Sequence, residues 1–177
     1  KLGSRKLVYA YLLKDIEINE PNKVWAVDIT YLKVQGGFIY LFAIIDIYSR
    51  YIVGWEVSNT LDTYFCISAL ESALNKAFPD IINCDQGSQF TSNAWCDFLT
   101  DHEIRLSMDG KGRCFDNIYI ERFWRTLKYE EIYLKSYTSV SELKLAVSEY
   151  INYYNNERPH QSLGYQTPYD VFMGSDD

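Results

Sequence analysis

The sequence predicts an α/β domain: a mixed sheet of three antiparallel and two parallel strands, flanked by helices. Three runs rich in β-branched and aromatic residues come first, between residues 24 and 57, and such residues favour strands. Two shorter apolar runs follow, each after a segment of helical composition. Because a strand–helix–strand connection implies parallel pairing, these later strands are expected to extend the same sheet.

The three early strands are predicted at residues 24–34, 38–46 and 51–57. Gln35, Gly36 and Gly37 separate the first two strands and are typical of a hairpin turn. Antiparallel pairing of neighbouring strands is therefore expected here.

The rest of the chain alternates helices and short strands. Thr91 or Ser92 would cap the second of the helices, and Ser139 with Glu142 forms a capping-box pattern at the last one. The tail after residue 154 is predicted as a loop punctuated by proline and glycine. The elements are expected as helix 61–78, strand 81–85, helix 91–102, strand 104–108, a helix from about 117 to 132, and a helix from 140.

The net charge of −7 and the sequence pI near 4.9 argue against a nucleic-acid partner. The distribution of charge is uneven, however. Residues 1–14 contain four bases and no acid. The segment 105–128 carries more bases than acids: Arg105, Lys111, Arg113, Arg122, Arg125 and Lys128 against Asp109, Asp116 and Glu121. If those acids bind metal or cap helices, the segment presents a basic face, so total charge leaves the question open.

The sequence also indicates the compartment. No apolar run approaches the roughly 20 residues of a membrane span, and no signal peptide is present. The four scattered cysteines favour reduced core residues over a zinc site or a disulfide framework. A cytoplasmic protein is expected, and the absence of an initiator Met suggests a fragment of it.

Three acidic residues stand where a solvated surface acid would not be expected. Asp28 lies inside the apolar strand VWAVDITYL, Asp85 ends the strand IINCD, and Glu121 lies on a predicted helix. Alternation puts Asp28 and Thr30 on one face of their strand. At 100° per residue, Glu121 points away from the apolar side of its helix, near Asn117, Trp124, Arg125 and Lys128.

Each acid alone has an ordinary structural explanation, as a strand-edge Asp, a turn Asp and a helix Glu paired with Arg125. Together they can converge on the carboxyl edge of the sheet, where ligands bind. Carboxylates without His or Cys suit oxygen-seeking ions such as Mg²⁺ or Mn²⁺. The three acids are therefore candidate metal ligands.

Several phrases resemble the integrase-core half of insertion-sequence transposases of the IS-three type, within the DDE transposase and retroviral integrase superfamily. The gap of 35 residues between Asp85 and Glu121 is similar to the spacing of the DDE signature. The resemblance runs from about residue 9 to residue 172. The phrases are WAVDITY, IDIYSRYIVGW, NCDQGSQFTS, DNIYIERFWRTLKYE and YNNERPHQSLGYQTP.

This resemblance implies an RNase H-like fold with Asp28, Asp85 and Glu121 as the catalytic triad. Two Mg²⁺ or Mn²⁺ ions, bridged by Asp28, would activate a nucleophile and stabilise the leaving oxygen. Water would nick DNA and free a 3′-OH, which then attacks a second phosphodiester. A joined or circular donor intermediate and a homo-oligomer on transposon ends and target DNA are also implied.

The resemblance further suggests how the chain is divided. Residues 1–20 would be a basic arm that ends an upstream DNA-binding region. Residues 21–135 would form the catalytic core, and residues 136–177 the C-terminal helix and tail of the same core.

Several residues near the triad are candidate DNA contacts, and each has a structural alternative. Gln89 would position the scissile strand or secure a turn. Asn117 would orient metal or DNA, or cap its helix, and Asp116 is the other candidate for that cap. Arg125 and Lys128 would contact phosphates or pair with Glu121 or Glu131. The basic segment adds two more candidates, Lys111 and Arg113.

Two other functions remain open at this stage. A related nuclease would use the same carboxylates to hydrolyse DNA without joining it. A non-catalytic DNA-binding or assembly module is the other, although the intact triad and the acidic net charge disfavour it. The basic arm and the tail with Arg158 and His160 favour the joining enzyme, and both residues are expected to secure the loop.

Overall fold

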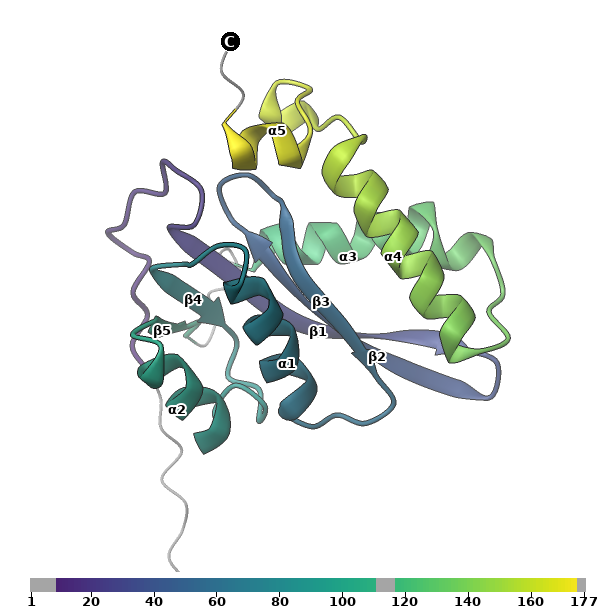
Figure 1. Ribbon diagram of the computed structural model, residues 1–177, viewed down its shortest axis with the longest axis horizontal. Coiled ribbons are helices and arrows are strands. Elements are labelled where there is room, and N and C mark those ends of the chain that lie inside the picture. Colours follow the sequence, from purple (N-terminus) through teal and green to yellow (C-terminus); the bar gives the residue numbers. More distant parts are fainter. Residues whose placement is uncertain (1–8, 111–116, 175–177) are drawn as a thin grey trace, which may run out of the picture.

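The computed structural model describes residues 9–110 and 117–174. Its five strands form one mixed sheet in the order β3-β2-β1-β4-β5 (Figure 1). Strands β1, β2 and β3 pair antiparallel, and β4 and β5 join in parallel, which confirms the predicted arrangement. The strands are β1 (Val24–Val34), β2 (Gly37–Asp46), β3 (Ile52–Ser58), β4 (Ile81–Cys84) and β5 (Arg105–Met108).

Helices cover both faces of the sheet (Figure 1). They are α1 (Tyr64–Leu74), α2 (Asn93–Asp101), α3 (Ile118–Glu130), α4 (Val140–Asn156) and α5 (Pro168–Met173), with single 3₁₀ turns η1 (Ile132–Leu134) and η2 (Gln161–Leu163).

Strand β1 supplies both hydrophobic cores by simple alternation. Trp25 and Val27 pack with α1 and α2 in one cluster. Val24 and Ala26 pack with α3 and α4 in the other. Successive side chains of a strand point to opposite faces, so Asp28 continues the row that faces α3.

Local differences from the prediction occur at helix ends. Helix α1 is shorter than the expected 61–78. Ser92 caps α2 as expected. At α4, Ser139 accepts from the Glu142 N–H, but the Glu142 carboxylate accepts from Thr138 instead of closing the capping box.

The tail expected to be a loop contains α5, which the sequence analysis missed. Thr167 and Asp170 form a complete capping box at its start, with Pro168 in the first turn. The proline and glycine that suggested a loop are the start and end signals of a short helix.

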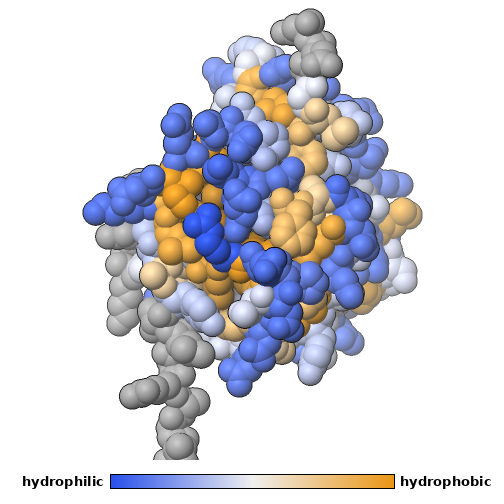
Figure 2. Space-filling view, turned by 60° about the vertical axis from the view of Figure 1, so that its left-hand side comes forward, coloured by the Kyte–Doolittle hydropathy of each residue, from blue (hydrophilic) through white to orange (hydrophobic). Residues whose placement is uncertain are grey.

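The described cysteines Cys66, Cys84 and Cys96 are buried and free, as predicted, whereas Cys114 lies outside the described residues. No helix in the described ranges is both long and apolar enough to cross a membrane. Figure 2 shows hydrophobic side chains in patches broken by hydrophilic ones on the face toward the viewer.

Candidate active site

Asp28 lies in the middle of β1, half-buried beneath α3. The indole N–H of Trp124, a buried residue of α3, donates a hydrogen bond of 3.0 Å to Asp28 Oδ2. The helical-wheel argument put Trp124 on the outer side with Glu121, but the ring reaches back to the sheet. Trp124 therefore holds the Asp28 carboxylate in place, a role that no local pattern indicated.

Burial raises the pKa of Asp28 to about 6. The hydrogen bonds from Trp124 and from the Ile29 backbone oppose this shift, whereas the negative charges of Asp85 and Glu121 add to it.

Asp85 directly follows β4, which pairs in parallel with β1 at Val24–Ile81 through Ala26–Asn83. Continuing this register by two residues brings Asp85 beside Asp28, on the face toward α3. The Gly87 N–H donates a hydrogen bond of 2.7 Å to Asp85 Oδ1. A Cβ atom on residue 87 would lie only 2.8 Å from that oxygen, so glycine lets the carboxylate occupy this position.

Glu121 lies in the first turn of α3 and is exposed. Asn117 is the N-cap residue of α3, as expected, but its side chain makes no capping hydrogen bond within the described residues, and the other candidate cap, Asp116, lies outside them. Asn117 is buried, and its Oδ1 has no hydrogen-bond partner among residues 9–110 and 117–174. An unpaired buried amide oxygen costs free energy, so Asn117 has unused capacity for a donor or an ion close to Glu121.

The three acids provide the oxygen ligands that Mg²⁺ and Mn²⁺ prefer. Within the described ranges, however, no three acidic, histidine or cysteine side chains are gathered closely enough to hold an ion. Asp28 is turned toward Trp124, Asp85 toward Gly87, and Glu121 toward solvent. The chemistry of the donor set fits a hard divalent ion, and its binding requires side-chain rotation.

A fourth carboxylate, Asp109, lies at the same edge and was not among the predicted site residues. It is buried directly after β5, and continuing the β4–β5 register places it beside Asp85. Asn83 Nδ2 donates to its Oδ1 at 3.0 Å, and Gln86 Nε2 donates to its backbone oxygen. Its position one residue past a parallel strand is the signal that also marked Asp85.

Lys128 lies two turns along α3 from Glu121 and reaches the sheet. Its Nζ donates a hydrogen bond of 2.8 Å to Thr30 Oγ1. Burial lowers the pKa of Lys128, and the charge of Asp28 opposes that shift. The alternative pairing with Glu121 or Glu131 does not occur in the described structure, where Glu131 pairs with Lys135 at 2.7 Å.

The other candidate DNA contacts are less closely tied to the site. Arg125 is exposed, with its guanidinium 5.7 Å from the centre of the Tyr129 ring. Gln89 is half-buried in the turn after β4, on the same side of Gly87 as Asp85 Oδ1. Lys111 and Arg113 lie outside the described residues.

The tail residues of the ERPH phrase stabilise the fold. Arg158 binds both carboxylate oxygens of Glu130 at the end of α3, with a shortest distance of 2.7 Å. The Tyr150 hydroxyl donates to the same carboxylate. Burial lowers the pKa of His160 to about 4, so its ring, which packs edge-on against Tyr154, is neutral. These contacts agree with the expected structural role.

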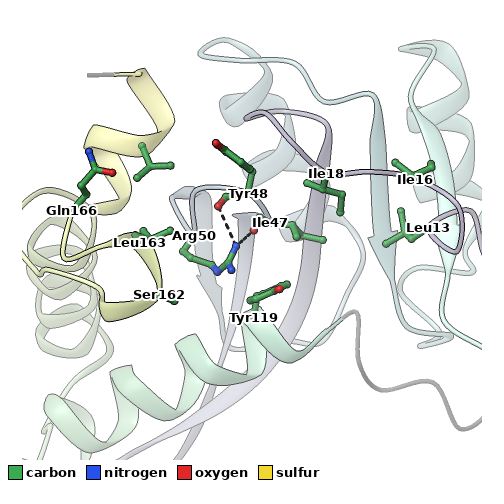
Figure 3. A pocket seen from close by; sticks show the side chains of 11 residues that line it. Leu13, Ile16, Ile18, Ile47, Tyr48, Arg50, Tyr119, Ser162, Leu163 and Gln166 are labelled. Atoms are coloured by element: carbon green, nitrogen blue, oxygen red, sulfur yellow. Dashed lines mark hydrogen bonds between the residues drawn. The ribbon is translucent and has the colours of Figure 1, made fainter. Parts of the chain in front are cut away.

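A separate cavity of about 620 Å³ lies away from the three acids, between the N-terminal segment, the β2–β3 turn and the tail (Figure 3). Arg50 points into it but donates to the carbonyls of Ile47 and Tyr48. Its guanidinium also stacks on Tyr119 at 3.7 Å. Arg50 therefore fastens the turn to α3.

The sequence of the chain matches a known protein family. The family model described as integrase core domain matches residues 18–114, and a second model of that description matches residues 102–168. The putative transposase InsK for insertion sequence element IS150 of Escherichia coli is 35% identical over 160 residues, covering 89% of this chain and 56% of InsK. The transposase for IS904 of Lactococcus lactis is 37% identical over 154 residues, covering 85% and 61%.

Solved structures show the same fold. A chain of the simian T-cell lymphotropic virus intasome, in complex with PP2A regulatory subunit B56 gamma, has a TM-score of 0.76 at 18% identity, covering 96% of this chain and 60% of that one. The HTLV-2 integrase catalytic core domain in complex with magnesium has a TM-score of 0.63 at 19% identity, covering 88% and 97%.

The expected RNase H-like fold is thus confirmed by retroviral integrase cores, and the expected family by relatives that are insertion-sequence transposases. The chain spans about 56% to 61% of the length of these two relatives. The protein belongs to the integrase core domain family.

Proposed function

We propose that this chain is the catalytic core of a DNA transposase, a polynucleotidyl transferase that cuts a DNA strand and joins a 3′-OH to another. One observation carries this proposal: Asp28 is held on the α3 face of β1 by Trp124 of the helix that carries Glu121, and Asp85 directly follows the strand that pairs in parallel with β1. The insertion-sequence transposases among the relatives support the reaction class.

The three carboxylates would hold Mg²⁺ or Mn²⁺, and the HTLV-2 integrase core in complex with magnesium supports that choice. Bound ions would activate the attacking oxygen and stabilise the leaving one. Trp124 orients Asp28, and Gly87 orients Asp85. Lys128 and Arg125 would contact phosphates beside the reacting bond.

The proposed reaction needs no nucleophile from the protein. In the first step the oxygen of water bonds to phosphorus, the bond to the 3′-oxygen breaks, and that oxygen leaves as a 3′-OH. In the second step the freed 3′-OH attacks a target phosphodiester and displaces its 3′-oxygen. Both steps exchange one phosphodiester oxygen for another, so a covalent enzyme intermediate is not required.

The remaining functions belong to the whole protein. We propose that residues 1–20 lead from an upstream DNA-binding region, that residues 21–177 form the core, and that the protein acts in the cytoplasm as a homo-oligomer on DNA. The transposases that this chain resembles are longer than it is, and one structural neighbour is a chain of a viral intasome.

A joining assay on duplex DNA with a pre-nicked 3′-OH tests the proposal. Asp28→Asn, Asp85→Asn and Glu121→Gln should each lower cleavage and joining by about a thousandfold, since loss of a metal ligand removes several kcal/mol of transition-state stabilisation. Glu71→Gln, on the opposite face of the sheet and exposed, is the matched control. Mg²⁺ or Mn²⁺ should support turnover, and Ca²⁺ only binding.

The assay also separates the other functions. Metal-dependent hydrolysis without any joined product would identify a nuclease. Binding without either reaction would identify a DNA-binding module. Full activity in chelator would exclude the metal mechanism.

A further inference from the structure

A second surface lies next to the proposed active site. It is a groove of about 860 Å³ between the β1–β2 hairpin and the segment that follows α3. Tyr31, Phe38 and Tyr133 line it, and each side chain is more than half exposed. Grouped exposed aromatic rings on a protein surface often mark a binding site.

The groove combines aromatic rings with a neighbouring cation. Tyr31 and Phe38 pack edge to face at 5.4 Å, and the Lys128 ammonium lies 5.7 Å from the centre of the Tyr31 ring. Tyr133 makes a similar edge-to-face pair with Tyr129. Single-stranded nucleic acid is bound by this combination, with bases on aromatic rings and phosphates on cations.

The charge of the groove is positive despite the acidic chain. Lys33, Lys128 and Lys135 line it. Lys135 is neutralised by Glu131, whereas Lys33 and Lys128 make no ion pair within the described residues. Two cations are therefore available for phosphates.

The groove begins at the proposed catalytic site. Lys128 lines the groove and donates to Thr30, which is two residues from Asp28 on the same face of β1. Tyr31 and Lys33 alternate with Thr30 and so point to the opposite face of β1, whereas the Lys128 ammonium contacts Thr30 and also lies 5.7 Å from the centre of the Tyr31 ring. A strand whose phosphate lies at Asp28 would therefore pass Lys128 at the edge of β1 before it reaches Tyr31 and Lys33.

We propose that this groove binds unpaired DNA leading away from the scissile phosphate, with bases stacked on Tyr31 and Tyr133 and phosphates on Lys33 and Lys128. The inference rests on the proposed function and adds the form of the substrate, which is single-stranded beside the reacting bond. Duplex DNA would keep its base faces stacked and unable to use the rings.

The first test measures binding in chelator, so that it does not depend on catalysis. The probe is a fluorescent oligothymidylate strand of about 12 nucleotides, compared with a duplex of equal length. Tyr31→Ala and Tyr133→Ala should each raise the Kd for the single strand about tenfold, the effect of losing one stacked base. Tyr133→Phe should keep wild-type affinity, because the ring remains.

Two matched controls lie outside the groove. Tyr64→Ala removes a ring in α1 that is even more exposed and should leave the Kd unchanged. Lys33→Ala should reduce the slope of log K against log salt concentration by about 0.7, the value for one phosphate contact on a single strand. Lys76→Ala, at an exposed position just after α1, should leave this slope unchanged.

The inference would be overturned if the Tyr31→Ala, Tyr133→Ala and Tyr64→Ala variants bound the single strand with equal affinity. It would also be overturned if Tyr31→Ala and Tyr133→Ala weakened the binding of duplex DNA as much as that of the single strand. Loss of self-association in the Tyr31→Ala variant with unchanged DNA affinity would instead assign the groove to a second copy of the chain. Wild-type protein that binds the strand through the groove yet neither cleaves nor joins DNA would contradict only the proposed function.

Discussion

The two faces of the sheet differ although β1 contributes to both. On the α1 and α2 face, Trp25 and Val27 are followed by Ile29, which packs against the same core, so this row of β1 stays apolar. On the α3 face, Val24 and Ala26 begin a similar core, but the row continues with Asp28 and Thr30. The α1 and α2 face thus contributes mainly to the stability of the fold. The α3 face contributes less stability but holds polar groups at fixed positions.

The largest expected effect is the loss of stability caused by a substitution in the core on the α1 and α2 face. Trp95 of α2 is fully buried and packs against Phe42 and Phe90. Trp95→Ala should lower the free energy of unfolding by about 3–5 kcal/mol, because it leaves a large cavity. Urea denaturation measures this change. A loss below about 1 kcal/mol would show that this core is loosely packed.

Two glycines, Gly54 in the apolar core and Gly87 beside the Asp85 carboxylate, sharpen the comparison. A Cβ on residue 54 would lie 3.1 Å from the Ala73 Cβ and 3.2 Å from the Ala69 oxygen, so Gly54→Ala should destabilise the fold by about 1–3 kcal/mol through overpacking. It should leave metal affinity unchanged.

Gly87→Ala should affect metal affinity more than the stability of the fold. The added Cβ would press on the Asp85 carboxylate, so Mg²⁺ affinity should fall while the thermal midpoint changes less than in Gly54→Ala. Calorimetric titration with Mg²⁺ and thermal unfolding of both variants check this. Equal metal affinity in the two variants would remove Gly87 as a positioning residue.

The polar face should gain stability when its central acid is neutralised. Since burial raises the pKa of Asp28 to about 6, the folded chain holds this proton more tightly than the unfolded chain. Ionisation therefore costs stability as the pH rises from about 4 to about 6. Asp28→Asn should be more stable than wild type by about 1–2 kcal/mol at pH 7, while the Trp124 N–H can still donate to the amide oxygen.

Urea unfolding at pH 4 and pH 7 checks the sign of this effect. The advantage of Asp28→Asn should be absent at pH 4 and complete above pH 6. Added Mg²⁺ should stabilise wild type but not the variant. A variant less stable than wild type at pH 7 would show that the Asp28 carboxylate is a structural group.

The smallest expected effect concerns Lys128. If its ammonium contacts phosphate, Lys128→Ala should weaken binding of all duplex sequences and lower the salt slope of binding by about one. Fluorescence titration at several salt concentrations measures the slope. An unchanged slope would leave Lys128 only its hydrogen bond to Thr30.

The sequence predicted most of the sheet because strand signals are local. The strand predicted at residues 24–34 has the same first and last residues as β1, and alternation assigned Asp28 to the face of Val24 and Ala26. The short strands and the cap at Ser92 also followed from neighbouring residues. Short α5 was missed, since proline and glycine signal both loops and helix ends.

By itself, the sequence determined where the strands lie along the chain and which face of β1 carries Asp28, because period-two alternation and strand ends are encoded within a few residues. Only the tertiary structure decided what surrounds them. Trp124 bonds to Asp28 from 96 residues away, and Asp109 reaches Asn83 from the next strand. Such contacts depend on how α3 and β5 pack on the sheet, and helical periodicity alone assigned Trp124 to the wrong side.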